Sequence, residues 1–171
     1  MAEAAAEGPI TEMVEAFRAV VAASPKFQAF VGVGDAVAAL GRLHVYTDGG
    51  EGVRPLGLVD VGDEFQETQN GVNVSEYSGS LILWLEKDVN AADGLPNATR
   101  LFMNAVGQIC SEVRSLRFSS VSVGGPALMS WRFLIKPQRM NASGAEADDD
   151  TVDSVSDYWM AMIEFRFEAG A

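Results

Sequence analysis

The chain has 171 residues, 48% of them hydrophobic, so it is long and apolar enough for one domain with an ordinary core. Its 24 acidic and 12 basic residues give a net charge of −12, which repels nucleic-acid phosphates and argues against sequence-specific DNA binding. No apolar run approaches the roughly 20 residues of a membrane helix, and the N-terminal "MAEAAAEGP" lacks the basic start of a secretory signal. We therefore expect a soluble protein that is made and kept in the cytoplasm.

The first 40 residues predict two helices, the second of them interrupted. Over residues 10–23, apolar side chains recur at spacings of three and four, which gives one apolar stripe. The Ser-Pro pair ending at Pro25 closes this helix, because a residue before proline avoids the helical conformation. A second helical stretch covers residues 26–40, and Gly32 and Gly34 predict a break within it.

The period then changes from helical to extended. Residues 42–47 and 55–61 are short and apolar or β-branched, which predicts two strands separated by a glycine-rich turn. Residues 62–71 are polar and end in an Asn-Gly pair, so we expect a loop there. The nearly continuous apolar run at 81–85 predicts a central strand covered on both faces.

The second half of the chain predicts one long helix and two strands. Helical apolar spacing runs over residues 97–116, a segment that includes the only cysteine, Cys110. Alternating patterns follow at 128–136 and, after an acidic stretch, in "DYWMAMIEFRFE". In that last strand Ile163, Phe165 and Phe167 face one way, and charged residues face the other.

These elements predict an α+β protein with a single mainly antiparallel or mixed sheet and helices packed on it. We expect one domain over residues 1–171, because neither an internal repeat nor a composition shift divides the chain. Residues 1–9 are expected to be a flexible N-terminus, and residues 138–157 a long acidic loop.

The acidic stretch "AEADDDTVDSVSDYW" is the most unusual segment of the sequence. Its members include Asp148, Asp149, Asp150 and Asp153, and carboxylates of this kind bind Ca²⁺ or Mg²⁺. An EF-hand loop, however, needs alternating acids, a central glycine and a terminal glutamate, which this stretch lacks. A solvated, mobile loop that joins two strands is therefore the preferred interpretation, and no metal site is predicted.

Patterns for catalysis are weak. The phosphate-binding loop, the nucleophile elbow and the zinc-protease motif do not occur in the sequence. Nothing places Cys110 near His44, the only histidine, so a buried apolar role for the cysteine is preferred. Tyr158 and Trp159 resemble a stacking platform for a base, but without basic neighbours we favour packing or a subunit contact. We predict no enzyme and no cofactor.

The order of elements resembles one known family. A helix leads to a short strand, strands around polar loops follow, and a helix after "NAADGLPNA" precedes a final antiparallel pair ending in "DYW" and "I.F.F". Over residues 10–168 this layout is similar to the tail-terminator, or tail-completion, proteins of long-tailed bacteriophages and prophages. That family has no invariant catalytic motif, so no single functional residue is carried over.

The resemblance implies a structural protein of the virion. Subunits of this family form a hexameric ring on the tail tube and make the joint to the head. The implied partners are further copies of the chain, the tail-tube protein and the head-completion or neck protein, and genomic DNA passes through without specific binding. The implied location is the tail or neck of a particle assembled in the host cytoplasm, with no membrane contact.

On this resemblance, the acidic stretch becomes a candidate contact. We expect a loop that projects toward the channel or a neighbour and contains Asp148, Asp149, Asp150 and Asp153. Tyr158 and Trp159 would anchor it to the final strand.

Two alternatives stay open. Another part of the same particle, a head-closure or neck subunit or a tail-tube protein, is the nearest. Tube proteins are built around sandwich-like barrels, so the long helix at 97–116 argues against that choice. A small cytoplasmic ligand-binding α+β dimer is an alternative of another class, and it needs a pocket with a few convergent polar groups.

Overall fold

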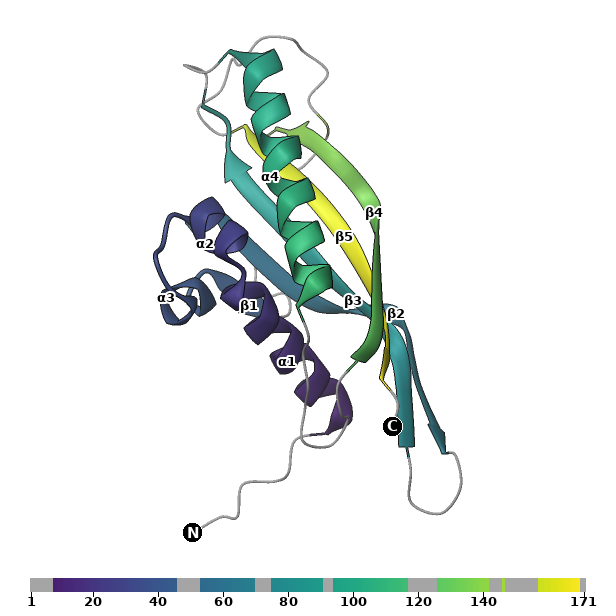
Figure 1. Ribbon diagram of the computed structural model, residues 1–171. Coiled ribbons are helices and arrows are strands. Elements are labelled where there is room, and N and C mark those ends of the chain that lie inside the picture. The colour runs from purple at the N-terminus through teal and green to yellow at the C-terminus, as the bar shows by residue number, and fades with distance from the viewer. Residues whose placement is uncertain are drawn as a thin grey trace.

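The computed structural model confirms the α+β prediction. Its described part contains one five-stranded sheet and four helices (Figure 1). The residues that the structure describes are 8–45, 53–69, 75–90, 94–116, 126–141, 146 and 157–169.

Three helices precede the sheet, where the sequence predicts two, the second with a break. They are α1 (Pro9–Ala23), α2 (Pro25–Val31) and α3 (Ala36–Leu40). The predicted break lies between α2 and α3, where Gly32 adopts a left-handed conformation (φ 74°) that glycine tolerates without strain. Asp35 then starts α3 by accepting a hydrogen bond from a backbone N–H of its first turn.

Five strands form one mixed sheet in the order β1-β2-β3-β5-β4. The short β1 pairs parallel with β2, and every other neighbouring pair is antiparallel. The strands are β1 (Leu43–Val45), β2 (Leu56–Gln69), β3 (Ser75–Asp88), β4 (Pro126–Met140) and β5 (Tyr158–Ala169).

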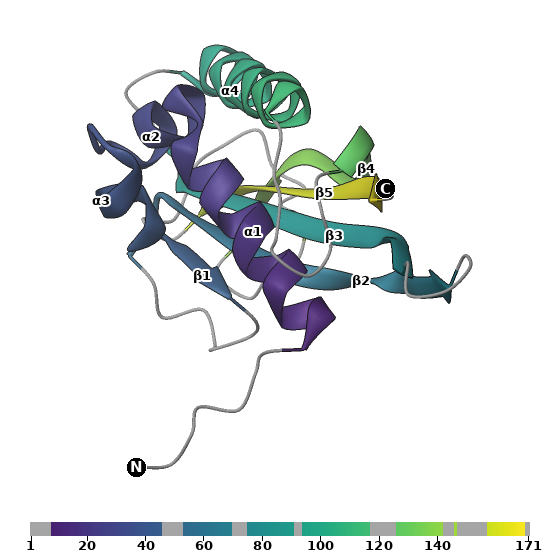
Figure 2. The same ribbon diagram turned by 60° about the horizontal axis from the view of Figure 1, so that its bottom comes forward.

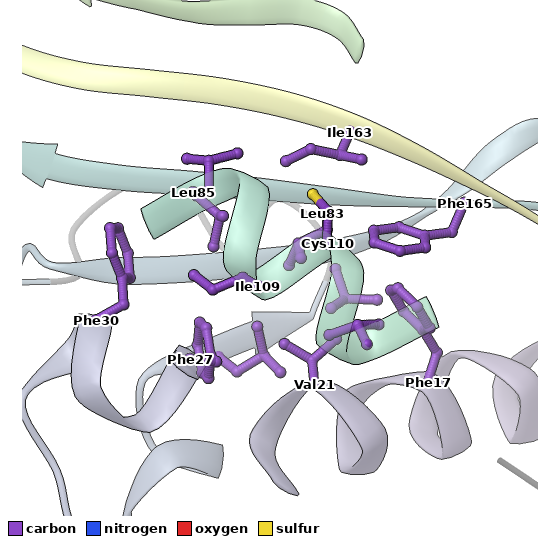
Figure 3. Close-up of a cluster of buried hydrophobic side chains, with 14 of the residues drawn as sticks. Phe17, Val21, Phe27, Phe30, Leu83, Leu85, Ile109, Cys110, Ile163 and Phe165 are labelled. Atoms are coloured by element: carbon purple, nitrogen blue, oxygen red, sulfur yellow. The ribbon is translucent and has the colours of Figure 1, made fainter. Parts of the chain in front are cut away.

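The helices pack on one face of the sheet. Figure 2 shows α1, α2 and α4 (Leu95–Ser115) on the same side of the strands. The core lies between these helices and strands β3 and β5, where Phe17, Phe27, Ile109 and Phe165 point toward one another (Figure 3). Burying a large apolar side chain contributes about 1.5–3 kcal/mol, so this single layer of contacts holds the helices on the sheet.

One half-buried carboxylate joins two of the helices. Glu112 of α4 accepts hydrogen bonds from the hydroxyl of Ser24 and from the backbone N–H of Lys26, the latter at 2.8 Å. Ser24 is fully buried, and its hydroxyl also accepts from the N–H of Phe27. The negative charge therefore lies at the N-terminus of α2, where the helix dipole favours it.

The prediction that residues 81–85 are covered on both faces is wrong. Leu81, Leu83 and Leu85 are buried under the helices, at no more than 1% exposure. Ile82 and Trp84 point to the opposite face and are only half-buried. The apolar run reflects an apolar outer face of the sheet, since alternate residues of a strand point to opposite sides.

The prediction of a loop at 62–71 is also wrong for residues 62–69, which the structure describes. These residues continue strand β2. After a bulge between Val61 and Phe65, residues Phe65–Gln69 pair in register with β3. The side chains there are mostly exposed. Exposed side chains have no reason to be apolar, so the polar composition of this part of the strand resembles that of a loop.

Two predicted boundaries differ from the observed ones, the start of the acidic loop and the end of the N-terminal segment. The expected acidic loop at 138–157 begins later, because β4 runs through Pro137 to Met140. Proline is tolerated at that position because β4 is the last strand of the sheet and its pairing is irregular between Ile135 and Gln138. At the N-terminus, Pro9 is the first residue of α1 and not part of a flexible segment.

Candidate subunit interface

The predicted contact residues fall into two groups. Asp148, Asp149, Asp150 and Asp153 lie outside the described residues. Tyr158 and Trp159 open strand β5, directly after the acidic stretch.

Trp159 belongs to the core of the subunit. Its exposed fraction is 5%, and its ring stacks on that of Phe102 with the centroids 6.0 Å apart. The indole therefore joins the sheet to α4 and offers almost no surface to a base or to a neighbouring subunit.

Tyr158 is half-buried under an arginine. The guanidinium carbon of Arg54 lies 3.8 Å from the centroid of the Tyr158 ring, within cation–π range. Arg54 also donates from Nε to Glu86 at 3.0 Å and from Nη1 to Asp88 at 3.4 Å. The ends of β3 and β5 are thereby held together with the chain that leads into β2.

Asp157 fixes the same end from the other side. Its carboxylate lies 3.8 Å from Nε of Arg139, and both side chains are only 7–8% exposed. Its backbone carbonyl accepts a hydrogen bond from Val89 N–H at 3.1 Å. The point where the acidic stretch joins β5 is thus anchored by a buried ion pair and a backbone bond.

The outer face of the sheet carries an apolar row. Leu58, Trp84 and Met162 lie directly opposite one another on β2, β3 and β5. All three are half-buried, and among the described residues no helix lies over this face (Figure 2).

A charged cluster lies beside this row. Glu164 is 6% exposed and accepts hydrogen bonds from Nε of Arg132 and Nε of Arg166. Arg166 also reaches Glu64 of β2 at 3.5 Å. Burial raises the pKa of Glu164, but the hydrogen bonds and charges of the two arginines outweigh that effect and hold its pKa below the ordinary value.

The sequence predicted the outward direction of Glu164 but not its partners. Alternation in the last strand places it opposite the apolar residues. To predict that Glu164 pairs with Arg132, one needs the register of β4 against β5. Alternation of side chains within one strand does not give that register.

The sheet has two free edges among the described strands. One is the outer side of β4, the last strand, apart from Met140, which forms a bridge with Glu146. The other is the distal part of β2, because β1 covers only Gly57–Val59. On the β4 edge Phe133 and Leu134 are 39% and 40% exposed, and they adjoin a bulge that turns consecutive side chains outward.

The two edge strands differ in the sign of their charged residues, although Arg132 and Arg139 of β4 are already paired with Glu164 and Asp157. Strand β4 contains three basic residues and no acidic one, whereas β2 contains four acidic residues and no basic one. The residues are Arg132, Lys136 and Arg139 on β4, and Asp60, Asp63, Glu64 and Glu67 on β2.

Cys110 and His44 do not form a reactive site. Cys110 is fully buried, and this burial raises the pKa of its thiol to about 12, so the nucleophilic thiolate is scarce at neutral pH. His44 lies in β1, and the described residues contain no group of three His, Cys, Asp or Glu side chains able to hold a metal ion. In that part of the chain, no helix is both long and apolar enough to span a bilayer.

A depression of about 910 Å³ lies at the distal end of the sheet, where Arg114, Glu64, Phe65, Arg166 and Phe167 contribute to its lining. Its volume falls within the range of small-molecule sites. Its lining includes consecutive residues of the same strands, whose side chains point to opposite faces. The polar groups therefore do not converge on one point.

No protein-family model and no curated protein sequence matches the chain. A solved structure titled "Virion of native gene transfer agent (GTA) particle" contains a similar chain, with 12% sequence identity and a TM-score of 0.43. The match covers 96% of this chain and 100% of that one. At this identity and TM-score, the likeness assigns neither a fold family nor a function.

Proposed function

We propose that the chain is a structural subunit of a phage-like virion. Specifically, it is the tail-terminator subunit, which forms a homo-hexameric ring that closes the tail tube and joins it to the head or neck. Its partners are further copies of itself, the tail-tube protein and the head-completion or neck protein.

Two different sheet edges, open among the described strands, carry this proposal. A closed ring requires two different surfaces on each subunit, so that each copy binds the next in one direction. The outer edge of β4 and the distal edge of β2 differ in this way. The order of helices and strands, with its resemblance to tail terminators, supports the choice among ring proteins.

The charge of the chain suits a tail channel. DNA must pass through such a ring without binding, and a net charge of −12 per subunit repels it. Screening limits this repulsion to about 10 Å at 0.1 M salt. Only loops close to the channel therefore contribute.

The acidic stretch fits the same proposal as a projecting loop. Its C-terminal end is anchored by the Asp157–Arg139 ion pair, and Asp148, Asp149, Asp150 and Asp153 face the channel or a neighbouring subunit. Replacing Asp148, Asp149 and Asp150 by serine tests this role. If ring formation and infectivity both stay unchanged, the loop is solvated surface only.

The depression at the distal end of the sheet supports a second candidate, a ligand-binding α+β protein, by its volume of about 910 Å³ alone, since its polar groups do not converge. A thermal-shift screen with common metabolites separates the two. A ligand present at 100 times its Kd stabilises its protein by about 2.7 kcal/mol, so a hit appears as a clear rise in melting temperature. The structural proposal predicts no such hit.

Labelling of particles tests the virion position. A tagged copy is expressed in the source cell, released particles are purified, and the tag is located by immunogold electron microscopy. The proposal predicts label at the joint between head and tail. Label along the whole tube indicates a tube protein, and particles without label contradict a virion role.

A further inference from the structure

The side of α4 that faces away from the sheet is open and carries a shallow hollow. Arg100, Gly107 and Arg114 follow one another at intervals of seven residues, which places them on one side of the helix over a length of about 21 Å. The hollow measures about 600 Å³, and its lining includes Lys26, Met103 and Gly107. Met103 is 51% exposed, and Figure 2 shows no labelled helix or strand over this side of α4.

This side is basic, although the chain as a whole is acidic. Helices α2 and α4 together contain three basic residues, Lys26, Arg100 and Arg114, and one acidic residue, Glu112. The carboxylate of Glu112 already accepts hydrogen bonds at the N-terminus of α2. Within the described part of the chain the three cations form no ion pair, and Arg100 donates only to the neutral side chain of Asn97. All three are exposed, so their charges are available to a partner.

These charges determine the kind of partner. Opposite charges across an interface fix the partner, whereas like charges there are unfavourable. The unpaired cations beside α4 therefore favour an acidic segment. In this chain the acids are densest over residues 146–153, where five of eight side chains are acidic. A second copy thus supplies a segment of the charge that this side of α4 requires.

The acidic stretch and the basic side of the helices belong to opposite sides of one copy. The flanks of the stretch are held at β4, where Glu146 forms a bridge with Met140 and Asp157 pairs with Arg139. Helix α2, by contrast, lies next to β2 through Phe27. Strands β2 and β4 are three positions apart in the sheet, which is about 14 Å. A segment on one side and its receiving surface on the other join copies head to tail, as a closed ring requires.

We propose that the exposed side of α4 in one copy binds the acidic stretch of the next copy, with Arg100 and Arg114 facing the carboxylates of residues 148–150. This inference names a contact between copies of the proposed ring and therefore rests on the proposed function. Gly107 lets the bound segment approach the helix backbone closely. Its own subunit does not require a glycine there, because a Cβ at this site meets no atom within 4 Å.

Complementary charge reversal tests the contact. The helix variant carries Arg100→Glu and Arg114→Glu, and the stretch variant carries Asp148→Lys, Asp149→Lys and Asp150→Lys. Sedimentation velocity measures the association of each variant, and of their equimolar mixture, from about 10 µM to 1 mM, a range that detects a Kd as weak as about 1 mM.

Either variant alone is expected to raise the Kd of self-association at least about tenfold, because like charges then meet at every contact. In the mixture the two variants alternate around a ring of six, and every contact again joins opposite charges. The mixture is therefore expected to regain wild-type association. Regained association also shows that both variants fold.

Two further variants separate the effects of charge and shape. Lys136→Glu changes the net charge as each substitution of the helix variant does, but it lies on the exposed surface of β4, and it is expected to associate like the wild type. Gly107→Leu leaves the charge unchanged and fills the hollow, so it is expected to raise the Kd at least about fivefold. Because leucine favours a helix more than glycine does, this loss does not come from unfolding.

Four results overturn the inference. Helix and stretch variants that associate like the wild type show that α4 meets the acidic stretch within one copy or not at all, and native mass spectrometry still decides the ring. A mixture of folded variants that stays dissociated shows that the two segments do not face each other. Equal weakening by Lys136→Glu shows that net charge controls association. A wild-type chain that stays monomeric up to about 1 mM also overturns the contact, while the immunogold label still decides the virion position.

Discussion

Gly62 occupies a position in the β2 bulge that leaves no space for a side chain. A Cβ built there lies 1.8 Å from Oγ and 2.8 Å from Cβ of Ser80, which is fully buried on β3. Rotation of Ser80 relieves the contact with Oγ but not the one with Cβ. Gly62→Ala therefore forces the two strands apart at the point where the distal arm of β2 begins.

We expect Gly62→Ala to lower the free energy of unfolding by about 3 kcal/mol, near the upper end of ordinary overpacking costs. For a chain of this length, that corresponds to a fall of about 6–12 °C in Tm. Urea unfolding followed by the fluorescence of the three tryptophans measures the change. Gly34→Ala is the control, because a Cβ there meets no atom within 4 Å, and we expect a change below about 1 kcal/mol.

Ser80→Gly provides the second half of the test. The Ser80 hydroxyl is buried and has no hydrogen-bond partner among the described residues, so its removal breaks no bond there. Glycine in a strand costs about 0.5–1 kcal/mol by itself. The double variant is expected to be more stable than Gly62→Ala alone, with a coupling of at least about 1 kcal/mol. A cost of Gly62→Ala below about 0.5 kcal/mol, or additive effects of the two substitutions, would refute the close approach of these strands.

Three further predictions concern single side chains. Glu164→Gln is expected to cost about 2 kcal/mol at pH 7. The pKa of Glu164 in the folded chain lies below its ordinary value of 4.5, so the ionised carboxylate stabilises the fold above pH 4.5. This stabilisation is lost as the pH falls through the folded pKa. Urea titrations at acid pH are therefore expected to give the same free energy of unfolding for wild type and variant. Gly107→Ala is expected to raise the free energy of unfolding by about 1 kcal/mol, since a Cβ at this site inside α4 meets nothing within 4 Å; unchanged stability in urea would contradict this. Cys110, with a pKa of about 12 and no exposed surface, is expected to react with a disulfide reagent only as fast as the chain unfolds, and rapid labelling of the native protein would show that the thiol is accessible.

Apolar periodicity predicted the elements that build the core. The stripe on residues 10–23, the long helix near Cys110 and the alternation of Ile163, Phe165 and Phe167 all face the same core. In each case the helices or strands bury one face and expose the other, so the sequence must show the period of the backbone.

Solvent-exposed extended structure could not be predicted in this way. The distal part of β2 is polar because its side chains beyond Phe65 are exposed, and pairing with β3 through backbone groups leaves no trace in side-chain hydrophobicity. The continuation of β4 through Pro137 depends on its place at the edge of the sheet, which only the strand order reveals.

The sequence located the start of the last strand, but whether an interface lies there stays a prediction. Tyr158 and Trp159 were identified from their place at the start of the last strand, and the structure places them at the start of β5. The free edges and the Arg132–Glu164 pair were not identified, because they depend on strand order and register between distant segments. The sequence offered one signal for the two edge strands: one is basic and the other acidic, in a chain that is acidic overall.

Native mass spectrometry of the purified wild-type chain, recorded across salt and Mg²⁺ concentrations, tests the central claim most directly. The subunit mass is 18.2 kDa, so the proposed homo-hexamer predicts a species near 109 kDa, six times that value. A stable dimer near 36 kDa, twice the subunit mass, with no larger species would contradict the ring and favour the ligand-binding alternative.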